Sequence, residues 1–190
     1  MGQKRHPPLI FTLPVLLAFL LGCGVGFRLH PLFTDPWVAS PTEKAPIRAC
    51  FSPEGNCTNG ILSAIHGANA SIFVQAYSFT SDKIATALRD AHHRGVDVRV
   101  LVDKSQLKSK HSQLSALVKD RIPLFIDSPK GLAHNKVMII DERYVLTGSF
   151  NFTKAAESRN AENILLVDDP FLARIYKENW EKRAEKAKKL

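Results

Sequence analysis

Residues 71–102, SIFVQAYSFTSDKIATALRDAHHRGVDVRVLV, contain the pattern that decides the fold. The run Ser71–Tyr77 is apolar and rich in β-branched and aromatic residues, which is typical of a buried strand. Ser81 suits the N-cap of a helix that Gly95 ends. Residues 96–102 then alternate between apolar and charged side chains, as a strand does. A strand, a helix and a second strand in succession predict an α/β fold.

The same alternation continues on both sides of this unit. Further helices are predicted over residues 58–68, 112–119 and 170–186, and further strands over 123–127, 136–140, 144–147 and 163–167. These elements predict a mixed central β-sheet flanked by helices, in one domain that spans residues 47–190.

The N-terminal part of the chain differs from this body. Residues 9–27 form an apolar run without a charge, which is long for a signal-peptide core and just long enough for a membrane span. Three alternatives stay open: a retained anchor, a cleaved signal peptide, or a lipoprotein processed at Cys23. We therefore predict a signal peptide or membrane anchor over residues 1–27 and a proline-rich tether over 28–46. Positive charge is heavier before the run than after it, so the body is expected to be exported, either periplasmic or anchored and facing the exterior.

Cys50 and Cys57 flank a turn-rich stretch. They form either a disulfide that closes a small loop or two free surface thiols. The predicted export favours the disulfide, because such bonds persist in oxidising compartments.

The net charge of the 190-residue chain is +8. A basic body attracts phosphate-bearing partners, either nucleic acid or an anionic lipid.

The residues with the clearest chemistry are His134 to Asp141, in the order HNKVMIID. His134 and Lys136 are two positions apart, so on a strand both side chains point to one face. An imidazole can attack phosphorus and leave again, and a lysine ammonium can neutralise phosphate oxygens. Asp141 ends the predicted strand and is expected to be a structural charge partner or a turn former.

Polar residues downstream complete the candidate site. Ser149 and Asn151 share a face just after a tight turn at Gly148, and they offer a hydroxyl and an amide to phosphate oxygens. Glu162 opens the next strand and could orient the histidine. The sequence contains no recognisable zinc or calcium ligand set and no glycine-rich phosphate loop, so we expect no metal and no cofactor.

The pattern His134-x-Lys136-x4-Asp141, followed by Gly148-Ser149-Phe150-Asn151, resembles the HKD signature of the phospholipase D superfamily. The similarity extends from residue 50 to residue 163, and it resembles the small single-motif bacterial endonucleases more than the large two-motif lipases. It implies the phospholipase D/nuclease fold and a metal-independent reaction. It also implies that His134 is the covalent nucleophile, that Lys136, Ser149 and Asn151 bind phosphate, and that Glu162 has a supporting role.

Family chemistry uses two histidines on opposite sides of the phosphorus, whereas this chain has one HKD motif. The resemblance therefore implies a two-fold homodimer with the active site at its interface.

Three functions remain in competition. The first is a non-specific endonuclease that hydrolyses DNA or RNA through a phosphohistidine intermediate. The second is a phospholipase D that hydrolyses phospholipid headgroups of the phosphatidylcholine or cardiolipin type, for which membrane association through the N-terminal segment would be convenient. The third is a catalytically silent nucleic-acid or membrane-binding module, against which the complete set of site residues argues.

Overall fold

The computed structural model describes residues 47–190. The segments predicted over residues 1–27 and 28–46, Cys23 included, lie outside the described residues. Among residues 47–190, no helix is both long and apolar enough to span a membrane.

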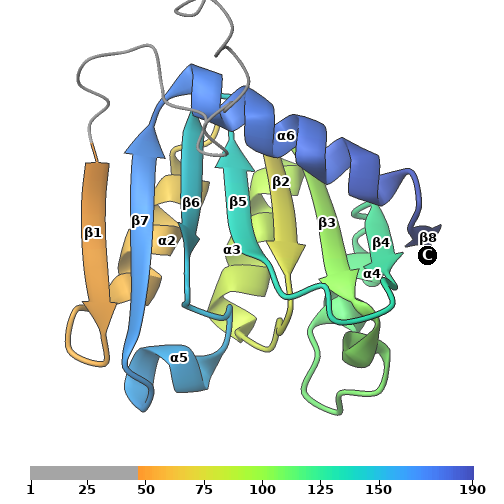
Figure 1. Ribbon diagram of the computed structural model, residues 1–190, viewed down its shortest axis with the longest axis horizontal. Helices are drawn as coiled ribbons and strands as arrows, with labels where there is room; N and C mark the ends of the chain where they lie inside the picture. The colour runs from red at the N-terminus through yellow and green to blue at the C-terminus, as the bar shows by residue number, and fades with distance from the viewer. Residues whose placement is uncertain (1–46) are drawn as a thin grey trace, which may run out of the picture. The chain divides into compact units, whose positions relative to one another are not determined.

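One eight-stranded sheet forms the centre of the domain (Figure 1). Its strands are β1 (Ile47–Ser52), β2 (Ser71–Ala76), β3 (Asp97–Asp103), β4 (Leu124–Asp127), β5 (Lys136–Ile140), β6 (Tyr144–Gly148), β7 (Glu162–Asp168) and β8 (Lys188–Lys189). They lie in the order β1-β7-β6-β5-β2-β3-β4-β8. The pairs β2–β3 and β3–β4 are parallel and every other pair is antiparallel. The predicted mixed sheet with flanking helices is therefore confirmed.

Helices cover both faces of this sheet. They are α2 (Cys57–His66), α3 (Asp82–His93), η1 (Lys104–Leu107), α4 (Leu114–Lys119), α5 (Lys154–Ser158) and α6 (Pro170–Ala184). In Figure 1, α6 crosses in front of the strands, and α2 and α3 lie behind them. The N-cap of α3 is Ser81, whose side chain accepts a hydrogen bond from the Ile84 N–H.

Alternation along the strands divides the core into two layers. On β2, Ile72 and Val74 belong to the larger cluster, which packs against α2 and α3. Phe73 belongs to the smaller cluster on the opposite face, together with Trp180 of α6. The Trp180 indole also donates a 2.9 Å hydrogen bond to the Val74 carbonyl oxygen, which fixes α6 across the central strands. Both faces of the central strands are thus buried, which explains their nearly continuous apolar sequence.

Four short elements were not predicted: β1, η1, α5 and β8. β1 is an edge strand whose outward-facing side chains stay exposed, so it lacks the apolar pattern of a core strand. Its conformation is instead determined by antiparallel pairing with β7 over Ile47–Ser52. β8 is similarly defined by its pairing with β4.

Candidate active site

The candidate residues other than Asp141 lie where strands start or end along one edge of the sheet, the lower edge in Figure 1. Lys136 begins β5 and pairs with Ala76, the last residue of β2. Gly148 ends β6 and pairs with Ile164 near the start of β7, which begins at Glu162. Because these four strands start or end at the same edge, their terminal side chains are neighbours.

His134 and Lys136 are in direct contact. The Lys136 ammonium lies 3.1 Å from each ring nitrogen of His134 and donates a 2.8 Å hydrogen bond to the His134 carbonyl oxygen. Tyr77, which follows β2, packs its ring against the imidazole at a centroid distance of 4.4 Å. The Lys136 ammonium is also 5.0 Å from the centroid of the Tyr77 ring. The imidazole, the ammonium and the Tyr77 ring are therefore mutual neighbours, while His134 stays exposed to solvent.

Lys136 is only 7% exposed, although it carries a charge. Burial lowers the pKa of its ammonium, and the negative charge of Glu162 partly offsets this effect. A lysine in this position is a fixed cation beside the imidazole, and its charge is less screened by water than that of a surface lysine.

Glu162 accepts two hydrogen bonds. The Ser149 hydroxyl donates to one carboxylate oxygen over 2.6 Å, and the Asn160 amide donates to the other over 2.9 Å. The Ser149 oxygen in turn accepts a 3.0 Å hydrogen bond from the Asn163 N–H. The start of β7 thus fixes both Ser149 and Glu162.

Gly148 has no side chain, which lets β6 lie close to Asn163 of β7. A Cβ atom at this position would lie 2.2 Å from the Asn163 carbonyl oxygen. The predicted tight turn at Gly148 is wrong, because Gly148 is the last residue of β6. The close contact between neighbouring strands, rather than turn geometry, requires glycine here.

Asn151 lies in the loop after β6, next to Phe152, which bridges to Phe79 beyond the end of β2. Its side-chain oxygen is buried and has no hydrogen-bond partner within residues 47–190. A buried polar atom without a partner costs about 1–3 kcal/mol. The loop therefore holds unused hydrogen-bonding capacity close to Ser149.

Asp141 is not part of this cluster. It follows β5 at the opposite end from Lys136 and adopts a left-handed backbone conformation with φ of 53°. Its carboxylate accepts hydrogen bonds from the N–H groups of Asn69, Ala70 and Ser71. This contact ties the loop before β2 to the turn after β5.

Cys50 and Cys57 form a disulfide in the structure, with their Cα atoms 5.6 Å apart. The bond links β1 to the first residue of α2.

Two residues that support the site, Asp103 and Tyr77, were not predicted from the sequence. Asp103 is 1% exposed, and its carboxylate accepts hydrogen bonds from the N–H groups of Ser105 and Ala133. Burial alone would raise the Asp103 pKa, but these hydrogen bonds hold it below its ordinary value. Asp103 therefore positions the segment immediately before His134. Asp103 could have been identified from the sequence, because it is a carboxylate at the end of an apolar strand. Nothing in the sequence around Tyr77 indicated its contact with His134.

Within residues 47–190, no three histidine, cysteine, aspartate or glutamate side chains converge to hold a metal ion.

Comparison with known proteins places this geometry in a family. The family model described as "Cardiolipin synthase, PLD-like domain" matches residues 61–184. A protein of Rickettsia conorii named "Phospholipase D" is 46% identical over 183 residues, covering 87% of this chain and 92% of that protein. The chain belongs to the phospholipase D superfamily. It is an enzyme of the phosphodiesterase class of hydrolases.

Other relatives in the superfamily differ in name. The human "Mitochondrial cardiolipin hydrolase" is 34% identical over 134 residues, which cover 70% of this chain and 53% of that protein. The crystal structure of the phospholipase D family member Nuc from Salmonella typhimurium superposes with a TM-score of 0.73 at 38% identity, covering 77% of this chain and 99% of that chain. The fold is thus that of the phospholipase D superfamily.

Proposed function

We propose that the protein hydrolyses phosphodiester bonds through a covalent phosphohistidine at His134, without a metal ion. The observation that carries the proposal is the contact of the exposed His134 imidazole with the buried ammonium of Lys136. An imidazole beside a fixed cation combines a nucleophile with electrostatic stabilisation of the phosphate that it attacks.

The proposed reaction has two steps. In the first, a ring nitrogen of His134 attacks phosphorus, the bond to the leaving oxygen breaks, and a protonated imidazole donates its proton to that oxygen. In the second, the imidazole that gave up its proton, a second one distinct from the nucleophile, removes a proton from water, the water oxygen bonds to phosphorus, and the P–N bond breaks to release a phosphomonoester and free His134. Lys136, Ser149 and Asn151 bind the non-bridging oxygens, and Glu162 positions Ser149.

We propose that the second imidazole is His134 of another copy in a two-fold homodimer. Among the described residues, the ring contacts and hydrogen bonds of the His134 imidazole are with Tyr77 and Lys136, and none joins it to another histidine. Exposed apolar residues at the same end of the sheet support an interface there. Phe51 is 67% exposed and pairs in register with Asn163, whose N–H contacts Ser149. An isologous contact would cover this surface on both subunits.

Nucleic acid is the first candidate substrate. Four lysines lie in the segments 104–110 and 128–135: Lys104, Lys108, Lys110 and Lys130. The Lys104 ammonium donates a 3.0 Å hydrogen bond to the Pro129 carbonyl oxygen, which joins the two segments, and the second segment contains His134. Cations beside the reacting group suit a polyanion bound through its backbone without sequence preference.

A phospholipid is the second candidate. Leu107 and Leu132 in these same two segments are 56% and 60% exposed, which suits contact with a lipid surface better than contact with nucleic acid. The names of the rickettsial and human relatives point in the same direction.

A single assay tests the proposal and separates the substrates. The full chain, with chelator present, is incubated with labelled DNA, with labelled RNA and with vesicles of phosphatidylcholine or cardiolipin. His134→Asn should abolish every activity, and mass spectrometry of the acid-sensitive intermediate should find the phosphoryl group, with its remaining ester substituent, on His134 of the wild type only. The exposed His66 at the end of α2 provides the matched control, His66→Asn. Activity of His134→Asn would refute the mechanism, and cleavage of lipid without cleavage of nucleic acid would select the second candidate.

We also propose that the catalytic body acts outside the cytoplasm. The Cys50–Cys57 disulfide supports this location, because disulfides form and persist in oxidising compartments. Fractionation of cells, with protease added from outside, tests it: protection of the body from protease in intact spheroplasts would contradict it.

A further inference from the structure

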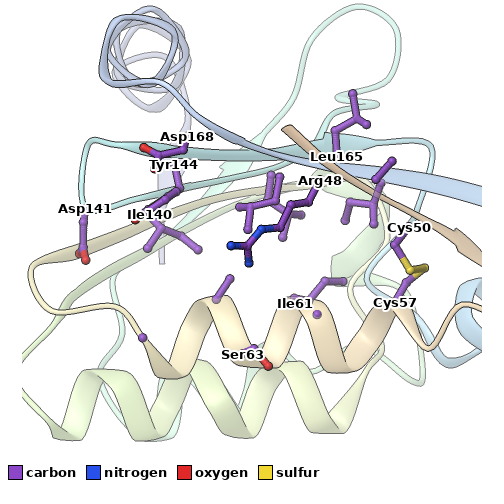
Figure 2. A pocket seen from close by; sticks show the side chains of 17 residues that line it. Arg48, Cys50, Cys57, Ile61, Ser63, Ile140, Asp141, Tyr144, Leu165 and Asp168 are labelled. Carbon is purple, nitrogen blue, oxygen red and sulfur yellow. A yellow bond between two sulfur atoms is a disulfide. The ribbon is translucent and has the colours of Figure 1, made fainter. Parts of the chain in front are cut away.

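A cavity separate from the catalytic edge lies between α2 and the strands β1, β7, β6 and β5 (Figure 2). Its volume is about 510 Å³, which is within the range of small-molecule sites. Its walls are mainly apolar and include Ile61, Ala64, Ile140, Leu146, Ile164 and Leu166.

Small residues border part of this cavity. Gly60 and Ala64 of α2 and its C-cap Gly67 line it beside the larger Ile61, and Gly60 and Gly67 are exposed to solvent. A Cβ atom added at Gly60 would meet no atom within 4 Å. Glycine inside a helix is less stable than alanine. A larger side chain at Gly60 could therefore occupy part of the open volume without a clash at its Cβ atom.

One charged side chain enters this apolar space. Arg48 lies on the edge strand β1, opposite Leu166 of β7, and Figure 2 shows its guanidinium group reaching between the sheet and α2. Within residues 47–190 it forms no ion pair or side-chain hydrogen bond. Arg48 is accessible to solvent, so an anion can reach it.

The two carboxylates that line the cavity already have other partners. Asp141 accepts hydrogen bonds from three backbone N–H groups of residues 69–71. Asp168 forms a two-point contact with Arg143, at 2.6 and 2.9 Å. Neither neutralises Arg48, so the cavity combines apolar walls with one unpaired cation.

We propose that this cavity binds an amphiphilic anion, with a single alkyl chain against the apolar walls and a carboxylate or phosphate head group against Arg48. Each buried methylene favours binding through the hydrophobic effect, and the planar guanidinium suits two-point contact with either head group. The Arg48 end of the cavity is at the opposite end of the strands from Lys136 and Glu162, so the site is distinct from the catalytic edge.

Photolabelling of the full chain tests the proposal independently of hydrolysis. The protein is held in digitonin, a neutral detergent without an alkyl chain, and labelled with a diazirine derivative of dodecyl phosphate. Mass spectrometry should place the label on peptides of α2 and β7. Unlabelled laurate and dodecyl phosphate should compete, and dodecanol should require at least about tenfold more, since it lacks the charge that pairs with Arg48.

Variants separate the head-group contact from the chain contact. Arg48→Gln should weaken labelling about tenfold or more, whereas Lys83→Gln, which removes an equal charge from the exposed surface of α3, should not change it. Gly60→Leu should reduce labelling by occupying part of the cavity, and Gly60→Ala should reduce it less. Hydrolysis of a soluble diester such as bis(p-nitrophenyl) phosphate should be unchanged in Arg48→Gln, which verifies folding.

Three outcomes would overturn the proposal. The first is label on peptides outside the cavity. The second is competition by dodecanol equal to that by laurate, which would indicate hydrophobic adsorption only. The third is the absence of labelling in the full chain, which would mean that the cavity is closed to ligands or filled by the chain's own residues before Ile47.

Discussion

The Ser149 hydroxyl donates a 2.6 Å hydrogen bond to the Glu162 carboxylate while its oxygen accepts a 3.0 Å bond from the Asn163 N–H. The hydroxyl proton is therefore directed at a carboxylate rather than at solvent. The hydroxyl has a single proton, so Ser149 can donate to a phosphate oxygen only after it turns away from Glu162, which holds it in place until then. Glu162 is in this sense a positioning residue of the proposed site.

Replacement of Glu162 by glutamine should lower kcat/KM by about tenfold to a hundredfold, because a hydrogen bond to a charged group contributes about 1.5–3 kcal/mol. Steady-state kinetics with a soluble diester measure the effect. Glu178→Gln on the exposed surface of α6 is the control. A Glu162→Gln enzyme with the wild-type kcat/KM would show that the carboxylate does not position Ser149.

The buried Lys136 should determine the alkaline limb of the pH profile. Burial lowers the pKa of its ammonium, so the phosphate-binding charge should be lost at a lower pH than the roughly 10.4 of an ordinary lysine. Glu162 opposes this shift, and Glu162→Gln should therefore move the alkaline limb of kcat/KM to still lower pH. Lys136→Arg should remove the limb, because a guanidinium stays protonated. An identical alkaline limb in the wild type and in Lys136→Arg would assign it to another group.

A shared active site makes a quantitative prediction for mixed dimers. If each site needs His134 from both subunits, only dimers of two wild-type chains are active. After equal mixing with His134→Asn and subunit exchange, the activity should be about a quarter of that of wild-type protein at the same total concentration. It should be about half if each chain works alone. Sedimentation verifies that both proteins are dimers. Activity that falls in proportion to the wild-type fraction would mean that each chain works alone.

The sequence alone was sufficient to predict the central strands and helices, and it identified His134 and Lys136 as neighbouring site residues. The long apolar strands and the amphipathic helix that starts at Ser81 have local signals that the tertiary structure reinforces. The spacing of His134 and Lys136 predicted that both side chains point to one face, and the structure brings them into contact, although His134 precedes β5 rather than lying on it.

Features that depend on distant pairing were not visible in the sequence. β1 has exposed side chains and forms through its register with β7, more than one hundred residues away. The packing of Tyr77 against His134 joins the segment after β2 to the segment before β5, which are far apart in the chain. Gly148 shows the same limit: a glycine before Ser149 suggested a turn, but the closeness of Asn163 on the neighbouring strand is what requires it.

Asp141 provides the last prediction, because its contacts agree with the structural role expected from its position at the end of the strand. Its carboxylate accepts N–H groups of Asn69, Ala70 and Ser71 at the far end of β5 from Lys136. Asp141→Ala should therefore lower the free energy of unfolding by about 2 kcal/mol, measured by denaturant titration, since it leaves backbone donors without their acceptor. At a temperature where the variant remains folded, kcat with a soluble diester should stay within a few fold of the wild type. Loss of turnover with unchanged stability would instead place Asp141 in the reaction, and Asp141→Asn, which keeps one acceptor oxygen, should recover part of the stability if the structural role is correct.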